Sequence, residues 1–204
     1  MTTVKEIPAK QVAELRARTG AGMMDCKKAL IETAGDLEKA VDVLRKSGAA
    51  KADKRAGREA AQGLIGSYVH FDGKIGVMVE LNCETDFVAN TEEFKALAKD
   101  LAVHIAATKP LTVKIEDLPA DLVARERAVY EAQVAEQKKP EQIRGKIVDG
   151  MLKKFYEENV LLEQKFVKDE THTRTVGELV KALAGKTGEN VYVRRFARFA
   201  LGGS

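Results

Sequence analysis

Residues 64–81 have the sequence LIGSYVHFDGKIGVMVEL, and the prediction of the fold class begins from this stretch. Two runs rich in apolar and β-branched residues, 64–71 and 75–81, flank Asp72-Gly73-Lys74. An Asp-Gly pair between two such runs is a strong signal for the turn of a β-hairpin. The stretch therefore predicts two antiparallel strands joined by a tight turn.

The closing run 191–199, VYVRRFARF, is β-branched and aromatic in part. This composition favours a strand, and we expect it to join the hairpin in one antiparallel sheet. Between the hairpin and this run, a long helix is predicted to begin near Thr91 and to end before Pro110. Apolar residues recur at helical spacing along this segment, namely Phe94, Leu97, Ala98, Leu101 and Ile105.

Two further helices are predicted to form a hairpin with charged outer faces. Pro119 begins the first, which runs to about Gln137, and Pro140 begins the second, which runs to about Glu158. The apolar residues Ile143, Ile147, Met151 and Phe155 recur every four residues along the second helix. A short helix follows, opened by the capping box Thr175-Val176-Gly177-Glu178 and ending near Gly185.

The N-terminal residues predict a three-helix bundle. The first helix begins at Pro8, and Thr19-Gly20-Ala21-Gly22 ends it. The second runs from Met23 to about Thr33, and Asp36 is a good N-cap for the third. Four apolar residues of the third helix form one stripe: Leu37, Ala40, Val41 and Leu44.

These elements predict an α+β protein with a three-stranded antiparallel sheet, packed helices and a helical hairpin behind a small N-terminal three-helix (UBA-like) module. We expect the N-terminal module at residues 1–50, a basic linker at 51–63 and the α+β core at 64–204. Residues 48–63 are rich in Ala, Lys, Arg and Gly, which favours a partly helical linker.

Composition and charge exclude several classes of protein. The chain has 204 residues and a formal net charge of 34 − 31 = +3, which is too mild to argue for nucleic-acid binding by itself. It lacks an apolar run of the roughly 18 residues that span a membrane, and its first residues lack the apolar stretch of a secretory signal. We therefore expect a cytoplasmic protein, in which Cys26 and Cys83 are packed, inert thiols.

An enzyme has little support in the sequence. His70, His104 and His172 are isolated, so a structural or surface role is expected for each, and no metal or cofactor is expected. Gly20 and Gly22 form a lone G-x-G, without the third glycine or the preceding strand of a phosphate-binding loop.

Two stretches remain as candidate binding sites. In residues 19–30, Met23 and Met24 are neighbours on a helix, so at least one is expected to be partly exposed. They either pack within the bundle or offer an adaptable apolar surface to another protein. In residues 81–90, Phe87 either folds back onto its own core while Asp86 caps the turn, or projects as an aromatic wedge into a partner.

Four runs of this sequence resemble the elongation factor Ts family. They are LRARTGAGMMDCKKAL at 15–30, RKSGA at 45–49, VELNCETDFVAN at 79–90 and GENVYVRRFARF at 188–199. The runs occur in order at both ends and in the middle, so the resemblance covers essentially the full chain.

The resemblance implies a guanine-nucleotide exchange factor that is not an enzyme. Family members bind the GTPase elongation factor Tu and speed its release of GDP by displacing the Mg²⁺ that bridges the phosphates. That role carries over to Thr85, Asp86, Phe87 and Val88, with Phe87 as the wedge and Asp86 as a polar contact. The family's N-terminal module docks on the GTPase, which points to Arg16, Met23, Met24 and Lys27.

The resemblance also bears on assembly, since longer family members carry two related core subdomains and this chain carries one. A short member can supply the second by homodimerising through sheet or helical surfaces. The rival interpretation is a basic nucleic-acid-binding module of the translation machinery. It would use the charged residues Lys51, Lys54, Arg55, Arg58, Arg194, Arg195 and Arg198.

Overall fold

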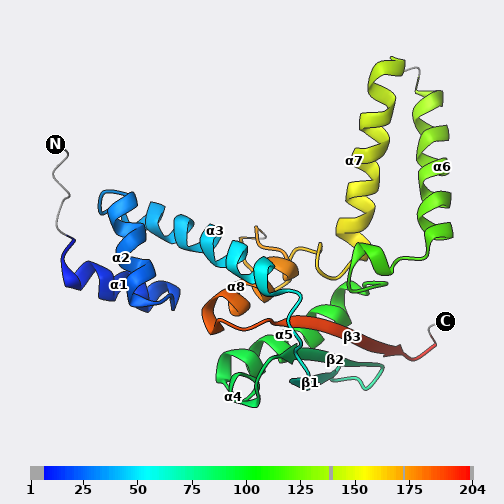
Figure 1. Cartoon of the computed structure of the whole chain (residues 1–204). Helices are drawn as coiled ribbons and strands as arrows, with labels where there is room; N and C mark the ends of the chain where they lie inside the picture. The colour runs from blue at the N-terminus through cyan, green and yellow to red at the C-terminus, as the bar shows by residue number, and fades with distance from the viewer. Residues whose placement is uncertain (1–6, 138–139, 172, 203–204) are drawn as a thin grey trace. The chain divides into compact units, whose positions relative to one another are not determined.

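The computed structural model describes residues 7–137, 140–171 and 173–202. The chain divides into two compact units. The first consists of Met1–Gly63, Asn82–Phe94 and Val180–Tyr192, and the second of Leu64–Leu81, Lys95–Leu179 and Val193–Ser204. The described residues contain eight α-helices and a three-stranded sheet, so the α+β prediction is confirmed (Figure 1).

The N-terminal helices form a small bundle in the first unit. They are α1 (Ala9–Thr19), α2 (Met23–Glu32) and α3 (Leu37–Arg55). Gly20 ends α1 at φ 68°, a left-handed conformation that glycine adopts without strain. Asp36 caps α3 as predicted, because its carboxylate accepts the backbone N–H of Lys39 at 3.1 Å. The buried residues of this bundle are Val12, Leu15, Cys26, Ala29, Leu30, Ala40 and Leu44.

Helix α3 continues past the bundle and packs against α8 (Val176–Thr187). A Cβ atom on Gly185 would lie 3.2 Å from the Cα of Gly48, so the two helices approach at a pair of glycines. The ion pair between Lys181 and Asp53, at 2.9 Å, lies along the same contact. Residues 51–55 of the expected linker are therefore helical, while the domain boundaries at 50 and 63 stay a prediction.

The sheet lies mostly in the second unit and has the order β1-β2-β3, with β1 at Gln62–Val69, β2 at Ile75–Cys83 and β3 at Tyr192–Ala200. The turn between β1 and β2 is closed by the N–H of His70, which donates to the carbonyl of Ile75 at 2.8 Å. Gly73 takes a φ of 69° in this turn, as the Asp-Gly signal predicted.

One face of the sheet is covered by α5 (Glu92–Thr108). Val77, Val79 and Leu81 of β2 are buried on this face. The approach of α5 to β1 is so close that a Cβ atom on Gly66 would lie 2.5 Å from the carbonyl oxygen of Ala98. The other face carries exposed apolar side chains, namely Ile65, Val69, Met78 and Phe199.

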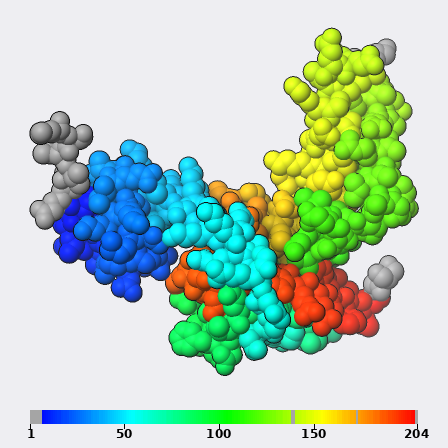
Figure 2. All heavy atoms as spheres, viewed as in Figure 1, coloured from blue at the N-terminus to red at the C-terminus, as the bar shows by residue number. Residues whose placement is uncertain are grey.

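The predicted helical hairpin is formed by α6 (Ala120–Glu136), which follows the 3-10 helix η1 (Ile115–Asp117), and α7 (Glu141–Asn159). Figures 1 and 2 show the two helices packed side by side. Their buried core consists of Val134, Val148 and Leu152. The predicted stripe along α7 is therefore only partly right, because Ile143 is exposed while Ile147 and Met151 are partly buried beside this core. Each helix packs here mainly against the other, which buries a narrow seam.

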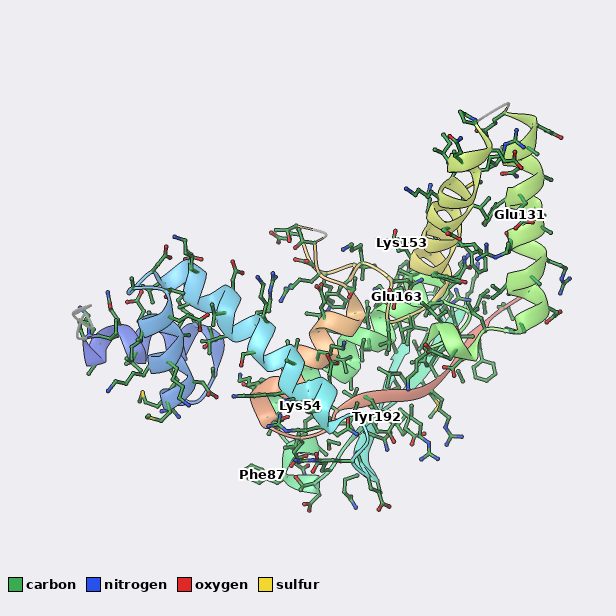
Figure 3. The ribbon with its side chains drawn as sticks, turned by 45° about the horizontal axis from the view of Figure 1, so that its top comes forward. Lys54, Phe87, Glu131, Lys153, Glu163 and Tyr192 are labelled. Atoms are coloured by element: carbon green, nitrogen blue, oxygen red, sulfur yellow. The ribbon has the colours of Figure 1, made fainter. Side chains whose placement is uncertain are left out.

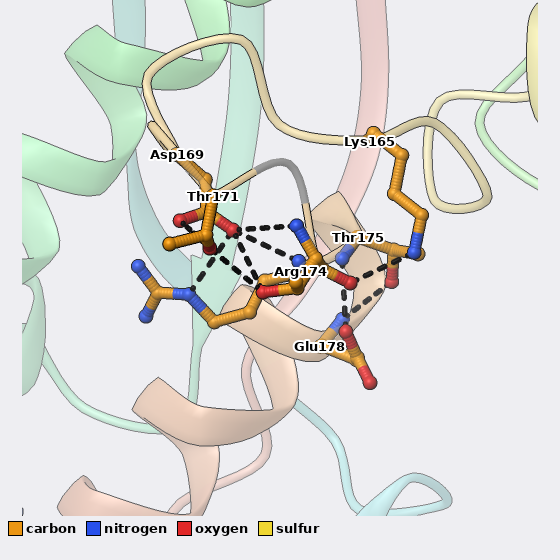
Figure 4. A network of polar contacts seen from close by, with 7 residues as sticks. Lys165, Asp169, Thr171, Arg174, Thr175 and Glu178 are labelled. Carbon is orange, nitrogen blue, oxygen red and sulfur yellow. Dashed lines mark hydrogen bonds and ion pairs between the residues drawn. The ribbon is translucent and has the colours of Figure 1, made fainter.

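The segment before α8 is held by a network of polar contacts around Asp169 (Figure 4). The carboxylate of Asp169 is buried and accepts the backbone N–H of Arg174 at 2.9 Å and that of Thr173 at 3.2 Å. These bonds, together with those from Thr171 and the charge of Arg174, lower the pKa of Asp169 to about 2. The predicted capping box follows directly, since Thr175 and Glu178 each accept the other's backbone N–H.

In the part of the chain that the structure describes, no helix is both long and apolar enough to cross a bilayer.

Candidate functional site

The stretch that the sequence singled out at 81–90 forms the end of β2 and a short helix, α4 (Asp86–Ala89), in the first unit. Thr85 is the N-cap of α4, because its Oγ1 accepts the backbone N–H of Val88 at 3.3 Å. The thiol of Cys83 donates to the carbonyl of Thr85 at 3.0 Å, and burial raises the pKa of this thiol. Cys83 and Cys26 are both buried free thiols, as expected.

Phe87 projects from α4 with 79% of its surface exposed (Figure 3). The next two residues, Val88 and Ala89, are 5% and 7% exposed. Neighbours on a helix lie about 100° apart, so burial of Val88 and Ala89 turns Phe87 outward. The interpretation in which Phe87 folds back onto its own core is wrong, and Thr85 rather than Asp86 caps the turn.

The four residues of the predicted Thr-Asp-Phe-Val site therefore divide by exposure. Thr85, Asp86 and Phe87 are exposed, whereas Val88 is buried. The side chain of Val88 anchors α4 to the protein's interior and cannot offer a contact surface in this conformation. Asp86 and Phe87 are therefore the two of these residues whose exposed side chains are not used in capping α4, since Thr85 is the cap.

A carboxylate from a distant part of the chain binds the segment just before α4. Glu189 accepts the backbone N–H groups of Glu84 and Thr85 through Oε2, at 3.1 and 3.0 Å, and the hydroxyl of Thr85 through Oε1, at 2.6 Å. Glu189 was not among the residues that the sequence singled out. It lies in the GENVYV run, but a glutamate next to a glycine predicts no partner about a hundred residues away.

Glu84 makes the reciprocal contact. Its Oε1 accepts the backbone N–H of Asn190 at 2.6 Å and pairs with Arg58 at 3.6 Å. The buried Asn190 in turn donates to the carbonyl of Arg58 at 2.8 Å. Residues 84–85, 189–190 and 58 are thus joined by hydrogen bonds beside the base of α4.

The second group of candidates, Arg16, Met23, Met24 and Lys27, lies on α1 and α2, and all four side chains are exposed. Met23 is 47% and Met24 65% exposed, so the prediction that at least one methionine faces solvent is confirmed for both. This group and α4 belong to the same compact unit.

The basic residues of the rival interpretation are largely engaged within the protein. Lys51 pairs with Asp25 at 2.8 Å. Arg194 and Arg195 both bind Glu80, at 3.4 and 2.7 Å, and the hydrogen bond from Arg195 lowers the pKa of that glutamate. Arg198 donates to the carbonyl of Ala106, and Arg58 pairs with Glu84. Such paired side chains form a weak basis for a nucleic-acid surface.

The histidines hold structural positions. His104 is fully buried, with Nε2 at 2.9 Å from Oε1 of Gln164, and His70 lies 2.9 Å from the hydroxyl of Tyr68. His172 lies outside the described residues. Across residues 7–137, 140–171 and 173–202, no three His, Cys, Asp or Glu side chains are grouped as metal ligands.

Comparison with known proteins identifies the family, because the model of the family described as elongation factor TS matches residues 9–203. The chain belongs to the elongation factor Ts family. The elongation factor Ts of Desulfosudis oleivorans is 56% identical over 196 residues, which cover 96% of this chain and 98% of that protein. The one from Thermosipho melanesiensis is 55% identical over 96% of this chain and 99% of its own length.

A third relative, the elongation factor Ts of Geobacter sulfurreducens, is 56% identical over 196 residues, which cover 96% of this chain and 90% of that protein. Because such relatives match along nearly their whole length, the resemblance seen in four short runs extends over the chain. Membership of the elongation factor Ts family assigns this chain the role of an exchange factor in translation elongation.

Proposed function

We propose that this chain binds elongation factor Tu in its GDP-bound form and speeds GDP release by disturbing the Mg²⁺ and phosphate contacts of the nucleotide. The observation that supports this most is the exposure of Phe87, whose side chain is 79% exposed although the next two residues of α4, Val88 and Ala89, are buried. A large exposed aromatic ring on an anchored element is the type of residue that dominates binding at protein interfaces.

The mechanism follows from how GTPases hold nucleotide. A phosphate loop and a Mg²⁺ ion bind the phosphates, and the metal neutralises much of their charge. Phe87 inserts beside this site and shifts the backbone that positions the metal's ligands, while Asp86 makes a polar contact next to it. Once the metal is displaced, the phosphate charge is poorly compensated and GDP leaves.

The N-terminal bundle supplies the docking surface. Met23 and Met24 offer flexible apolar contacts, and Arg16 and Lys27 place positive charges beside them. Binding at this surface brings the wedge to the GTPase without contributing to the release step. The two groups therefore have separate effects, one on affinity and one on rate.

Thermodynamic linkage sets the direction of exchange. If the factor weakens GDP binding by some ratio, GDP weakens factor binding by the same ratio. The factor therefore cannot set the final nucleotide state and acts as an exchange factor rather than an enzyme. It speeds the approach to equilibrium in the cytoplasm, where the excess of GTP decides which nucleotide rebinds.

This chain forms a homodimer, in which the second copy supplies the second core subdomain that longer family members carry in one chain. The face of the sheet opposite α5 exposes Ile65, Val69, Met78 and Phe199 beside the ion pairs of Glu80, and a second copy would bury these apolar side chains. Sedimentation equilibrium measures this directly. A monomer at all accessible concentrations would contradict the dimer and leave the exchange proposal standing.

The exchange proposal is tested by stopped-flow release of a fluorescent GDP analogue from elongation factor Tu. Adding this chain should raise the release rate, and the increase should saturate with its concentration. An unchanged rate, with binding demonstrated by calorimetry, would contradict the proposed function.

A further inference from the structure

We propose that Glu189 is a positioning residue for nucleotide exchange, because its carboxylate holds the segment from which α4 presents Phe87. This inference rests on the proposed function of Phe87. It adds a residue that lies 102 positions after Phe87 in the sequence. In this proposal, Glu189 contacts neither the ring of Phe87 nor the GTPase.

The contacts of Glu189 converge on one turn of backbone. Its two oxygens accept three hydrogens, from the N–H groups of Glu84 and Thr85 and from the Thr85 hydroxyl, at 2.6 to 3.1 Å. A carboxylate is the side chain suited to this arrangement, since it accepts on both oxygens and charge shortens and strengthens such bonds. The same Thr85 hydroxyl oxygen accepts the N–H of Val88 and thereby caps α4.

Helix α4 needs such support, because it contains only four residues, Asp86–Ala89. A single helical turn is unstable by itself, since nucleation orders several residues for one hydrogen bond. Burial of Val88 and Ala89 holds one side of the turn, and the Glu189–Thr85 contacts hold its first residue. Loss of the Glu189 carboxylate would leave α4 attached at its buried side but free to vary in the direction of Phe87.

The functional consequence is a change in rate rather than in fold. An exposed hydrogen-bond network contributes little to global stability, because water replaces its bonds. A wedge that spends only part of its time in the competent orientation acts in proportion to that fraction. Glu189→Ala should therefore lower the maximal rate of GDP release about tenfold, while binding through the N-terminal bundle changes little.

Orientation of residue 87 is measured without any GTPase. The chain contains no tryptophan, so Phe87→Trp introduces a single indole at the position of interest. Time-resolved fluorescence anisotropy should show larger rapid motion of this indole when Glu189→Ala is added. Unchanged motion in the double variant would overturn the positioning role, whatever the protein's activity.

A matched pair of variants separates positioning from direct contact with the partner. Glu189→Gln keeps one oxygen for the two backbone N–H groups and offers its amide to the Thr85 oxygen, but removes the charge. If Glu189 positions α4, Glu189→Gln should recover much of the exchange rate and of the indole's order. If the charge itself contacts the GTPase, Glu189→Gln would be as slow as Glu189→Ala with an ordered indole, which would overturn the proposal.

The exchange assay includes the wild-type chain and Glu131→Ala, which removes an exposed carboxylate on α6 (Figure 3). Both should give the full rate. Failure of the wild type to speed GDP release would contradict the proposed function and leave the anisotropy result as an independent measure of Glu189. Full activity of Glu189→Ala beside an active wild type would contradict the positioning role alone.

Discussion

The side chains of His104 and Gln164 lie sixty positions apart in sequence and meet at 2.9 Å in the interior of the second unit. The other ring nitrogen of His104, Nδ1, accepts the backbone N–H of Val167 at 3.3 Å. The ring is therefore neutral, with its hydrogen on Nε2, which donates to Gln164. A proton added at Nδ1 would remove the acceptor of Val167 and place a charge in a buried position.

Acidification should destabilise the protein through His104. Burial lowers the pKa of His104 below its ordinary value of 6.5, while the bond to Gln164 acts in the opposite direction. In the unfolded chain His104 thus binds a proton near pH 6.5, whereas in the folded chain it binds one only at lower pH. The stabilisation is complete above that pH and decreases, by at most about 1.4 kcal/mol per pH unit, as pH falls toward the folded pKa.

Urea denaturation at about pH 7.5 and about pH 5 measures this effect. His104→Gln should be less stable at the higher pH and should lose less on acidification than the wild type. His70→Gln removes a histidine of the hairpin and serves as the control. An equal loss in the wild type and His104→Gln would contradict the role assigned to His104.

Phe87→Ala should slow GDP release from elongation factor Tu about thirtyfold at saturating factor, which corresponds to loss of a hot spot of about 2 kcal/mol. The ring is 79% exposed, so its removal should leave the melting temperature unchanged. Phe71→Ala, at a ring that is 93% exposed in the β1–β2 turn, is the matched control and should keep the full rate. Stopped-flow release showing equal rates for both variants would remove the wedge from the mechanism.

Met24→Asp should weaken binding to the GTPase with little effect on folding, because the side chain is 65% exposed on α2. A carboxylate placed in an apolar contact loses the packing and must be desolvated, so we expect affinity to fall by about tenfold or more. Val129→Asp, at an exposed apolar residue of α6, is the control. Calorimetric titration that gives Met24→Asp the wild-type affinity would exclude this surface.

Gly66→Ala should destabilise the second unit by about 1–3 kcal/mol, because the new methyl group would lie 2.5 Å from the backbone oxygen of Ala98. Gly76→Ala in β2 is the matched control, since no described atom lies within 4 Å of its added Cβ. Alanine lowers the conformational entropy of the unfolded chain, so Gly76→Ala should be as stable as the wild type or slightly more stable. Thermal melts in which the two variants behave alike would show that α5 shifts to accommodate the methyl group.

Much of the fold was predictable because its signals are local. The Asp72-Gly73 turn, the cap at Asp36 and the box of Thr175 and Glu178 each depend on residues a few positions apart. The stripe on α7 was less predictable. Spacing shows that a face is apolar, but the partner helix decides which part is buried, and here it covers Val148 and Leu152 rather than Ile143.

The sequence identified the stretch that forms the candidate site, but it did not predict in which direction the Phe87 side chain points. The motif around Phe87 was visible from residues 79–90, yet its pattern left open whether the ring was buried or exposed. Burial of Val88 and the cap from Thr85 decide that it faces outward. Arg194 and Arg195 both pair with the carboxylate of Glu80, a contact that the sequence did not indicate.

Residue patterns alone indicate the strands, the longer helices, the caps at Asp36 and Thr175 and the family, because these depend on periodicity, on local backbone preferences and on runs of neighbouring residues. The contact between Glu189 and Thr85, the exposure of both methionines of α2 and the outward direction of Phe87 follow instead from how the chain packs. The physical reason is that burial and long-range hydrogen bonds depend on which distant segments pack together, and no local pattern records that pairing.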